Sequence, residues 1–526
     1  MCEVTKENFS SLLPEIRELV DEAKFIAIDA EFTGISLQTS NNFSLRDGGS
    51  SRYGKLKAIA KEFSLCQIGL SIFVKEKDEN QFIAHTYTFY LFPDHTGSED
   101  VRFGIQVSSL SFLRQHGFNF NKWIQNGIGY LNNQQEKALR EASLESSDDA
   151  IVQKFREIVG WLRNAKCGDQ LQLEAKHFSF TVRMQSIMDK LLPPNKVVLK
   201  DISGLLYAKC LDPIDDSTVL PDDISVASWD QIVDEMVGFT HVVRHLCQSG
   251  KPIVGHNVLL DLLFICDKFI CDLPDSYEEF KATVHAALPI VYDTKQLCYE
   301  MKQFVARGDR ELLAFSSLAD LFFSLSSARA LQSRLMAPAV VHCTKSSIYD
   351  GHRHWHEAGF DAYMTGCVFV RVLSFALTSG FRVDEVQKAK FSRLLQLASP
   401  YKNRLRIPRS AILYCNLEGL DKSRCLYYLH VSPRQGVSDS AFSQLAQLLS
   451  GFGAVESHQL DRQRALVVAG SKKCGDMLLQ DFEGSDVFIM RPYWFFDSPF
   501  VRSAARWICV VGVILLASGY KYVKLR

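Results

Sequence analysis

The chain has 526 residues, of which 47% are hydrophobic and 23% charged, and its formal net charge is −1. This length exceeds what one compact core accommodates, so we expect two or more domains. Near-neutrality excludes the overall positive charge typical of strongly basic nucleic-acid binders, although it leaves room for a local basic patch. The 14 cysteines are spread mostly singly, with Cys266 and Cys271 the closest pair, which favours free thiols over a disulfide framework or a zinc site.

Alternating helix and strand patterns fill the first 165 residues. Residues 12–24 have the periodicity of an amphipathic helix, and three strands are predicted in FIAIDAEF (25–32), SLCQIGLSIFV (64–74) and FIAHTYTFYLFP (82–93). The polar, Gly- and Ser-rich stretch 36–60 predicts a surface loop, and residues 134–165 predict helix. Strands that alternate with helices indicate an α/β core around a mixed sheet.

The second half of the chain changes character twice. Residues 167–228 have weaker periodicity and a polar, acidic end, which indicates an insertion. A helix at 229–249, the strand KPIVGHN, the helix NVLLDLLFICDKF and the strand end LPIVYDTKQL follow, and residues 324–352 are expected to be irregular before a long helix near His356. After the basic linker KNRLRIPRS (402–410), shorter elements predict a small βαββαβ-type domain, with the strand ILYCNL first.

The two ends of the chain differ. The N-terminal MCEVTKENFSSLLPEI carries acids and no apolar core, so it does not resemble a secretory signal. Near the other end, residues 507–520 carry no charge, and residues 504–523 approach the roughly 20 residues that a membrane span needs. We therefore expect a transmembrane tail anchor at 504–523, with a buried C-terminal helix as the alternative. The bulk of the chain would then lie on the cytoplasmic face of the mitochondrial outer membrane or the endoplasmic reticulum.

Five acidic and histidine side chains interrupt apolar runs where a charge is costly. Asp29 and Glu31 lie two residues apart in FIAIDAEFTG, so both face one side of the strand end; Asp261 lies in IVGHNVLLDLL, and His356 and Asp361 in HEAGFDAY. Two divalent cations about 3.5–4 Å apart can activate water and neutralise the charge of a phosphodiester transition state, and such hard ions prefer carboxylates. Taken singly, each residue could be a solvated strand end, the polar face of a helix or an ordinary histidine. Their joint occurrence favours metal-dependent phosphodiester cleavage.

The order Asp-x-Glu, GHN-x-x-x-Asp and His-x-x-x-x-Asp resembles that of the DEDDh exonucleases, and in particular the deadenylase branch with the poly(A)-specific ribonuclease (PARN) family. The matching phrases are DAEFTGIS, CQIGL, FYLFP, SSLSFL, FNFNKWIQNGIGYLN, SGKPIVGHNVLLD, LPDSYEEFK, DTK and HEAGFDAYMTG. A PARN-like group with a membrane-anchored tail, which trims the 3′ ends of piRNA precursors, resembles the chain more closely than PARN itself does.

This resemblance implies an RNase H-like DEDDh exonuclease core, formed by residues 1–166 and 229–395. Within it, four carboxylates would hold two Mg²⁺ ions, with Mn²⁺ able to substitute: Asp29, Glu31, Asp261 and Asp361. His356 would take the proton from the attacking water, a role suited to a group that titrates near neutrality.

The resemblance also implies contacts to the nucleotide. Phe32, Ile35 and Phe112 match positions that line the nucleotide path, and Lys295, in DTK, matches a contact to phosphate or base. Stacking on aromatic rings suits single-stranded RNA. Core packing is the alternative for the three apolar residues.

Two further segments depart from the family pattern. Residues 167–228 take the place of a small domain named for an Arg-x-x-x-His signature, which is not evident here, so we expect a degenerate version. Residues 405–495 resemble the RNA-recognition-motif (RRM) domain of the family, but ILYCNL has Leu413 where an aromatic side chain usually stacks, and RQRALVVAG also lacks aromatics. The cap-stacking tryptophan of the family falls at His458, so cap binding is not expected. Subunit pairing or docking of a protein partner is an equal hypothesis.

The leading hypothesis is a Mg²⁺-dependent 3′-to-5′ exoribonuclease that releases 5′-mononucleotides. By resemblance, its substrates would be PIWI-bound piRNA precursors, its recruiter a Tudor-domain scaffold and its oligomeric state a homodimer. The alternatives are a deadenylase of mRNA poly(A) tails, an inactive adaptor that holds RNA, and a DNA exonuclease.

Overall fold

The structure, a computed structural model, describes residues 2–37, 43–76, 81–93, 101–141, 148–173, 178–193, 196–202, 205–214, 228–305, 307–314, 317–327, 339–342, 356–377, 391–434 and 442–494, together with residues 501 and 511. The chain divides into two compact units. The large unit comprises Met1–Ser36 and Leu56–Arg404, and the small unit comprises Leu37–Lys55 and Leu405–Arg526.

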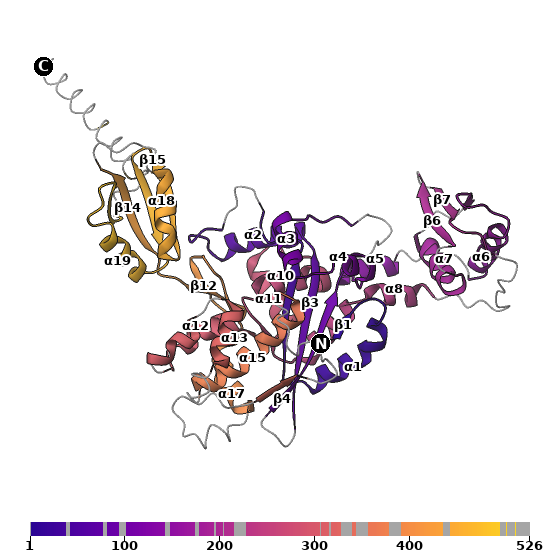
Figure 1. The fold of residues 1–526 in the computed structure, drawn as a ribbon, viewed down its shortest axis with the longest axis horizontal. Coiled ribbons are helices and arrows are strands. Elements are labelled where there is room, and N and C mark those ends of the chain that lie inside the picture. Colours follow the sequence, from indigo (N-terminus) through magenta and orange to yellow (C-terminus); the bar gives the residue numbers. More distant parts are fainter. Residues whose placement is uncertain are drawn as a thin grey trace, which may run out of the picture. The chain divides into compact units, whose positions relative to one another are not determined.

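A seven-stranded mixed sheet forms the centre of the large unit (Figure 1). Its strands follow in the order β1 (Cys2–Val4), β4 (Gln81–Tyr90), β3 (Leu65–Lys75), β2 (Phe25–Phe32), β8 (Ile253–Gly255) and β9 (Val291–Asp293), and β10 (Ala339–His342) also pairs with β4. The strands β2, β3 and β4 are antiparallel, whereas β8 runs parallel to β2 and β9 parallel to β8. The predicted mixed α/β core is therefore confirmed.

The strand positions follow from their side chains. Residues 65–73 of β3 are all buried, as a central strand covered on both faces requires. The long helix α15 (Ala358–Leu377) packs against β2 and β3. Phe25 of β2 stacks on Phe73 of β3 at a centroid distance of 4.5 Å and meets Phe369 of α15 edge to face at 5.1 Å. This aromatic cluster fixes α15 across the two strands.

The large unit contains further helices outside the insertion. They are α1 (Phe9–Glu22), α3 (Val107–Gln115), α4 (Phe120–Asn126), α5 (Asn133–Glu141), α8 (Trp229–Val237), α9 (Thr240–Ser249), α10 (Leu259–Ile265), α11 (Tyr277–Ala287), α12 (Thr294–Met301), α13 (Leu318–Ser326) and α17 (Phe391–Ala398). The expected helix at 229–249 is split into α8 and α9 at Gly238. A side chain there would meet the carbonyl oxygen of Gly129 at 2.0 Å.

The insertion has a hydrophobic core of its own. It contains α6 (Asp148–Leu162), β5 (Gln170–Leu173), α7 (Phe178–Leu191), β6 (Val197–Ile202) and β7 (Leu205–Cys210), with the strand order β5-β7-β6. Phe155 and Ile158 of α6 are buried in this core, so the lobe begins before residue 167. Its kinship with an Arg-x-x-x-His domain stays a prediction.

Two local expectations are wrong. The loop expected at 36–60 ends in a helix, α2 (Gly49–Glu62), whose Tyr53, Leu56, Ile59 and Ala60 are buried at the spacing of one helix face. The helix begins with glycine and serine, which are typical of loops, so the sequence alone predicts a loop here. The irregular stretch expected at 324–352 contains β10, which gains its strand geometry by pairing with β4.

The small unit contains the expected βαββαβ order. It is formed by β14 (Tyr427–Pro433), α18 (Phe442–Leu449), β15 (Val455–Asp461), β16 (Arg464–Ala469), α19 (Lys472–Asp481) and β17 (Phe488–Pro492) in an antiparallel sheet of order β15-β16-β14-β17. The expectation that ILYCNL is the first strand is wrong. This segment, β12 (Ile412–Asn416), lies with β11 (Arg404–Arg406) and β13 (Lys422–Ser423) in a separate sheet. The RRM likeness stays a prediction.

One face of the four-stranded sheet is occupied by another part of the same unit. Leu45 is fully buried in a cluster with Leu466 and Val468 of β16. The carboxylate of Glu456 on β15 accepts hydrogen bonds from the Leu45 amide at 2.8 Å and from the Ser44 hydroxyl at 2.9 Å. Residues 44–45 therefore cover the face that lies opposite the two helices.

The expectation of a tail anchor, with a location at an organelle membrane, is corrected. Among the residues that the structure describes, no helix combines the length and apolar character needed to cross a bilayer. Segment 504–523 itself lies outside the described residues, apart from Val511. The cysteines in the described part of the chain are all free thiols, as expected from their spacing.

Candidate active site

The strand β2 carries the first two candidate residues side by side. Asp29 lies opposite Gly69 of β3, and Glu31 lies opposite Gln67. Because their positions differ by two, both carboxylates project to the same side of the sheet. The residues before them, from Phe25 to Ile28, are buried, so the acids mark the point where an apolar strand reaches the site.

Two helix N-termini bring the remaining acids. Asp261 lies in the first turn of α10, and Asp361 in the first turn of α15. Carboxylates are favourable there because the free amides and the helix dipole give this end a partial positive charge. The short connection from β8 to α10 requires Asn257 at φ +61°, and its amide donates a hydrogen bond to Asp293 at 3.0 Å.

The four carboxylates lie close enough to interact electrostatically. Burial and the nearby Asp361, Asp261 and Glu31 raise the pKa of Asp29 well above its usual range. Burial, Asp361 and Asp261 do the same to the pKa of Glu31. Burial raises the pKa of Asp261, with a contribution from Asp293, to about 7, and the pKa of Asp361 to about 7. Such a cluster disfavours its own ionised form unless cations are present.

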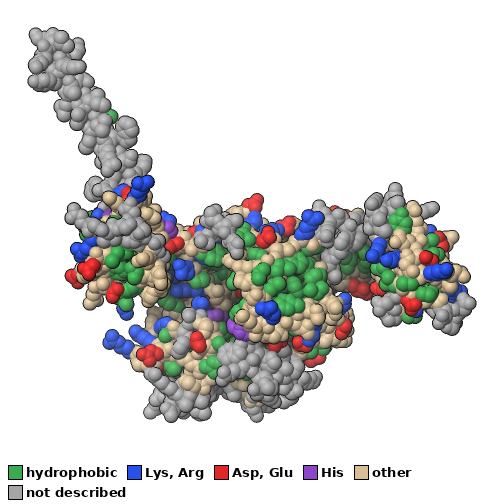
Figure 2. All heavy atoms as spheres, turned by 45° about the horizontal axis from the view of Figure 1, so that its top comes forward, with side chains coloured by type: hydrophobic (Ala, Val, Ile, Leu, Met, Phe, Trp, Pro, Cys, Tyr) green, Lys and Arg blue, Asp and Glu red, His purple; other side chains and the backbone are tan. Residues whose placement is uncertain are grey.

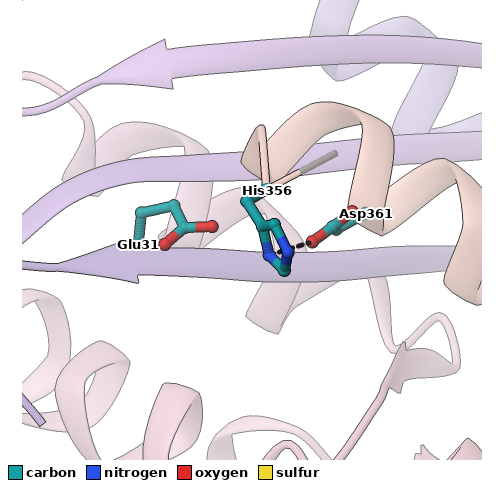
Figure 3. A group of neighbouring side chains, drawn as sticks. All are labelled: Glu31, His356 and Asp361. Atoms are coloured by element: carbon teal, nitrogen blue, oxygen red, sulfur yellow. Dashed lines mark ion pairs between the residues drawn. The ribbon is translucent and has the colours of Figure 1, made fainter. Parts of the chain in front are cut away.

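His356 lies between two of these acids (Figure 3). Glu31, His356 and Asp361 each offer a ligand atom within 4.8 Å of the others, and His356 Nδ1 is 3.9 Å from an oxygen of Asp361. The side chain of His356 is 41% exposed, whereas that of Asp361 is 13% exposed. Burial and the neighbouring His116 lower the pKa of His356, so a substantial part of it is neutral near pH 7.

The chemistry of these groups fits hard divalent cations. The one metal-type cluster found among the described residues consists of Glu31, His356 and Asp361 and includes no thiol. Asp29 and Asp261 interact electrostatically with its two carboxylates. Among the described residues, Oδ1 of Asp361 is a buried oxygen atom without a hydrogen-bond partner. This oxygen is therefore available to bind a ligand. Oxygen ligands of this kind suit Mg²⁺ or Mn²⁺ and not a soft metal.

A pocket of about 430 Å³ adjoins Glu31. Its lining contains three residues predicted to face the nucleotide, Phe32, Ile35 and Phe112. Its polar wall is supplied by Ser36, Gln106, Ser108 and Ser109. The structure thus brings the three apolar residues together beside the acidic cluster, and their contact with RNA stays a prediction.

The mouth of this pocket is apolar. Ile35 is 52% exposed and Phe112 40% exposed, so these side chains are available to a ligand. On the face of the large unit drawn in Figure 2, hydrophobic side chains gather next to histidine side chains. Such a surface fits bases and sugars better than it fits phosphates alone.

Lys295 does not line this pocket. It lies half-buried in the first turn of α12, and its amide donates to Asp293 at 2.9 Å. Asp293 is itself buried and caps α12. The structure therefore places Lys295 next to the acid that faces Asp261, and its role as an RNA contact stays a prediction.

Three residues that shape the site escape sequence reasoning. Gly69 allows the backbone of α15 to approach β3, because a Cβ there would lie 1.8 Å from the carbonyl oxygen of Ala358. Gln106 holds the pocket wall, since its side-chain oxygen accepts from the Ile35 amide at 3.0 Å and its nitrogen donates to the Ser36 hydroxyl at 2.9 Å. His116 contacts His356 at a ring-centroid distance of 4.2 Å. Only Gly69, in CQIGL, lies within a recognisable phrase.

Comparison with known proteins agrees with this geometry. Residues 4–369 match the CAF1 family ribonuclease model, so the chain belongs to this family of ribonucleases. Poly(A)-specific ribonuclease PNLDC1 of Mus musculus is 31% identical over 431 residues, which cover 80% of either chain. The pre-piRNA 3′-exonuclease trimmer of Bombyx mori is 29% identical, over 93% of either chain. Poly(A)-specific ribonuclease PARN of Homo sapiens is 30% identical, over 88% of this chain and 75% of its own. The chain is accordingly a 3′-to-5′ exoribonuclease of the PARN and PNLDC1 type.

Proposed function

We propose that the chain removes nucleotides from the 3′ end of single-stranded RNA with two Mg²⁺ ions, and releases 5′-mononucleotides. The observation that carries the proposal is the meeting of four carboxylates from β2, α10 and α15, each with a raised pKa. Asp29, Glu31, Asp261 and Asp361 would hold the ions in a DEDDh arrangement. Bound Mg²⁺, or Mn²⁺ in its place, lowers the pKa of water and neutralises charge on the phosphoryl oxygens.

The protein groups supply the proton transfer and the orientation. His356 accepts the proton of the attacking water at a ring nitrogen, a role supported by its lowered pKa and its partly exposed ring. The 3′-terminal base enters the pocket of Phe32, Ile35 and Phe112, where stacking tolerates different bases. Lys295 contacts a phosphate or base near the site. A contact to the 2′-hydroxyl would favour RNA over DNA.

We infer further that the physiological substrates are piRNA precursors held by a PIWI protein, with the 3′ overhang fed into the site. The likeness to the Bombyx mori trimmer, over 93% of either chain, supports this choice. Deadenylation is the second candidate, because relatives that are 31% and 30% identical carry the name poly(A)-specific ribonuclease. A Tudor-domain recruiter and a homodimer stay predictions from resemblance.

A matched pair of substrates separates the two candidates. The purified chain is given a 3′-oligo(A) RNA and a mixed-sequence RNA of equal length, each free or loaded on a PIWI protein. Trimming predicts similar rates on the two sequences and a stop at the PIWI footprint, whereas deadenylation predicts that cleavage halts where the adenosines end. We expect the purified chain to trim PIWI-bound RNA slowly, because recruitment is missing. Full speed without a partner would contradict the recruitment.

The adaptor hypothesis is separated by one substitution. Asp29→Ala removes a central carboxylate and should abolish both cleavage and the cellular effect on RNA 3′ ends. An adaptor that merely holds RNA would keep its cellular effect in this variant.

A further inference from the structure

The ring of His356 is held by two rings from the end of α3. Phe112 meets it at a centroid distance of 4.5 Å and 66°, and His116 at 4.2 Å and 62°. Phe112 and His116 also contact each other at 4.6 Å. The three rings therefore form one cluster, in which Phe112 and His116 each meet His356 edge to face and are tilted relative to each other. Contacts of this geometry are favourable beyond the area they bury.

The support itself is rigid. Leu113, between the two aromatic residues, is 1% exposed and lies in a cluster with Cys66, Tyr90 and Trp123. The helix ends at Gln115, with His116 as its C-cap, and Gly117 follows at φ +80°. The Phe118 amide then donates to the carbonyl of Leu113 at 3.0 Å, which closes the helix end in a Schellman-type turn. The positions of Phe112 and His116 are thus set by a buried anchor and a closed helix end.

His356 needs such support because its backbone is unusual. Its φ is +61°, in the left-handed region that costs a non-glycine residue energy unless its surroundings hold it there. It lies two residues before the start of α15, and its backbone hydrogen-bonds the carboxylate of Asp361. A base must stay within hydrogen-bonding reach of the attacking water, so a small displacement of this ring weakens proton transfer.

We propose that His116 is a positioning residue, whose ring, together with that of Phe112, holds the imidazole of His356 over the acidic cluster. This inference rests on the proposed role of His356 as the base. It gives α3 a second task beside the pocket wall, because Phe112 serves both the nucleotide pocket and His356. His116 does not line the pocket, and its ring contacts both His356 and Phe112.

Kinetics of four single variants and one double variant on a 3′-labelled RNA oligomer test the proposal. His116→Ala should lower kcat about tenfold, the size expected from losing one such ring contact, and leave KM within about twofold. His116→Phe keeps a ring and should restore kcat to within about threefold. Gln115→Ala, on the adjacent exposed position, is the matched control and should behave as wild type. The melting temperature of each variant reports whether the fold is intact.

The fourth variant separates this inference from the proposed function. His356→Ala should lower kcat by a factor of about 10² or more, and adding His116→Ala to it should cost nothing further. An inactive His356→Ala beside an unaffected His116→Ala would overturn the positioning role alone. A rise in KM without a change in kcat would also overturn it, because His116 would then contact RNA. No recovery of kcat with His116→Phe would overturn it as well, because a ring at this position would then not support His356. Full activity of His356→Ala would overturn the proposed role of His356 as the general base, and with it the inference about His116.

Discussion

Asp29 lies directly opposite Gly69 in the antiparallel pair of β2 and β3. The space that a side chain would take at Gly69 is filled by the backbone of Ala358, at the start of α15. This close approach of helix and strand is what brings Asp361, one turn along α15, to the side of Asp29. The proximity of Asp29 and Asp361, which are far apart in the sequence, thus depends on the absence of a Cβ at Gly69.

Gly69→Ala should therefore impair cleavage at least tenfold and lower the melting temperature. The new Cβ would meet a carbonyl oxygen at 1.8 Å, and a helix backbone cannot move aside as a flexible side chain can. Gly160→Ala in α6 is the control, because nothing lies within 4 Å of its Cβ. A helix gains about 0.5–1 kcal/mol from this change. Wild-type cleavage by Gly69→Ala would show that α15 does not approach β3 as described.

The acidic cluster predicts a particular dependence of stability on pH. The pKa of Asp261 and of Asp361 is about 7 in the folded protein, against about 3.9 in an unfolded chain. Between these values the folded state binds more protons than the unfolded state, so the free energy of unfolding falls as the pH rises from about 4 to about 7. The loss is at most a few kcal/mol, because the groups titrate together.

Thermal unfolding with EDTA at about pH 5 and pH 7.5 measures this effect. Mg²⁺ should raise the melting temperature more at the higher pH, where the carboxylates are ionised and bind it. Asp261→Asn should flatten the pH dependence, whereas Asp476→Asn, an exposed aspartate of α19, should not. An equal Mg²⁺ effect at both pH values would contradict a carboxylate metal site.

The apolar pocket mouth predicts a selective effect on RNA binding. Ile35→Ala should raise KM for a single-stranded RNA a few-fold with little change in kcat, since contacts of this kind contribute on the order of 1 kcal/mol. Ile124→Ala is the matched control, because this isoleucine is 54% exposed, against 52% for Ile35, and lies outside the pocket. The same KM for both variants would mean that the base does not enter this pocket.

The small unit yields a prediction about stability. Leu45→Ala should reduce its free energy of unfolding by about 2–4 kcal/mol, because it opens a cavity against Leu466 and Val468. Leu420→Ala, at a position 93% exposed in the same unit, should change it by less than about 0.5 kcal/mol. Denaturant titration monitored by hydrogen exchange in residues 427–492 measures the difference. An undisturbed sheet in Leu45→Ala would show that residues 44–45 do not cover its open face.

Much of the central sheet is predictable because its strands are largely apolar, as in residues 65–73. The acidic residues are predictable as a group, because a charge within an apolar run is costly and several such charges together indicate a common site. α2 is not predictable, because it begins with Gly49 and Ser50, which are poor helix formers, and it gains its stability from packing. Residues 427–433, and not ILYCNL, form the first strand of the four-stranded sheet in the small unit. This outcome depends on long-range strand pairing, which local propensity does not reveal.

The supporting residues of the site are hidden for the same reason. Gly69 matters because of Ala358, and His116 because of His356, and in each pair the partners are far apart in the sequence. Gly69 lies in the recognisable phrase CQIGL, but nothing in that phrase indicates a contact with Ala358, and His116 lies in no such phrase. The sequence therefore reveals the groups that do the chemistry more readily than the groups that hold them in place.

The most direct test is digestion of one RNA oligomer, labelled either at its 3′ or at its 5′ end, by wild type and Asp361→Ala, with Mg²⁺ and with EDTA. We predict that wild type with Mg²⁺ releases the 3′ label at once as a mononucleotide and shortens the 5′-labelled RNA stepwise. Both effects should vanish with EDTA and fall by a factor of about 10² or more in Asp361→Ala. Cleavage that persists in Asp361→Ala, or that proceeds without a divalent ion, would contradict the shared metal site.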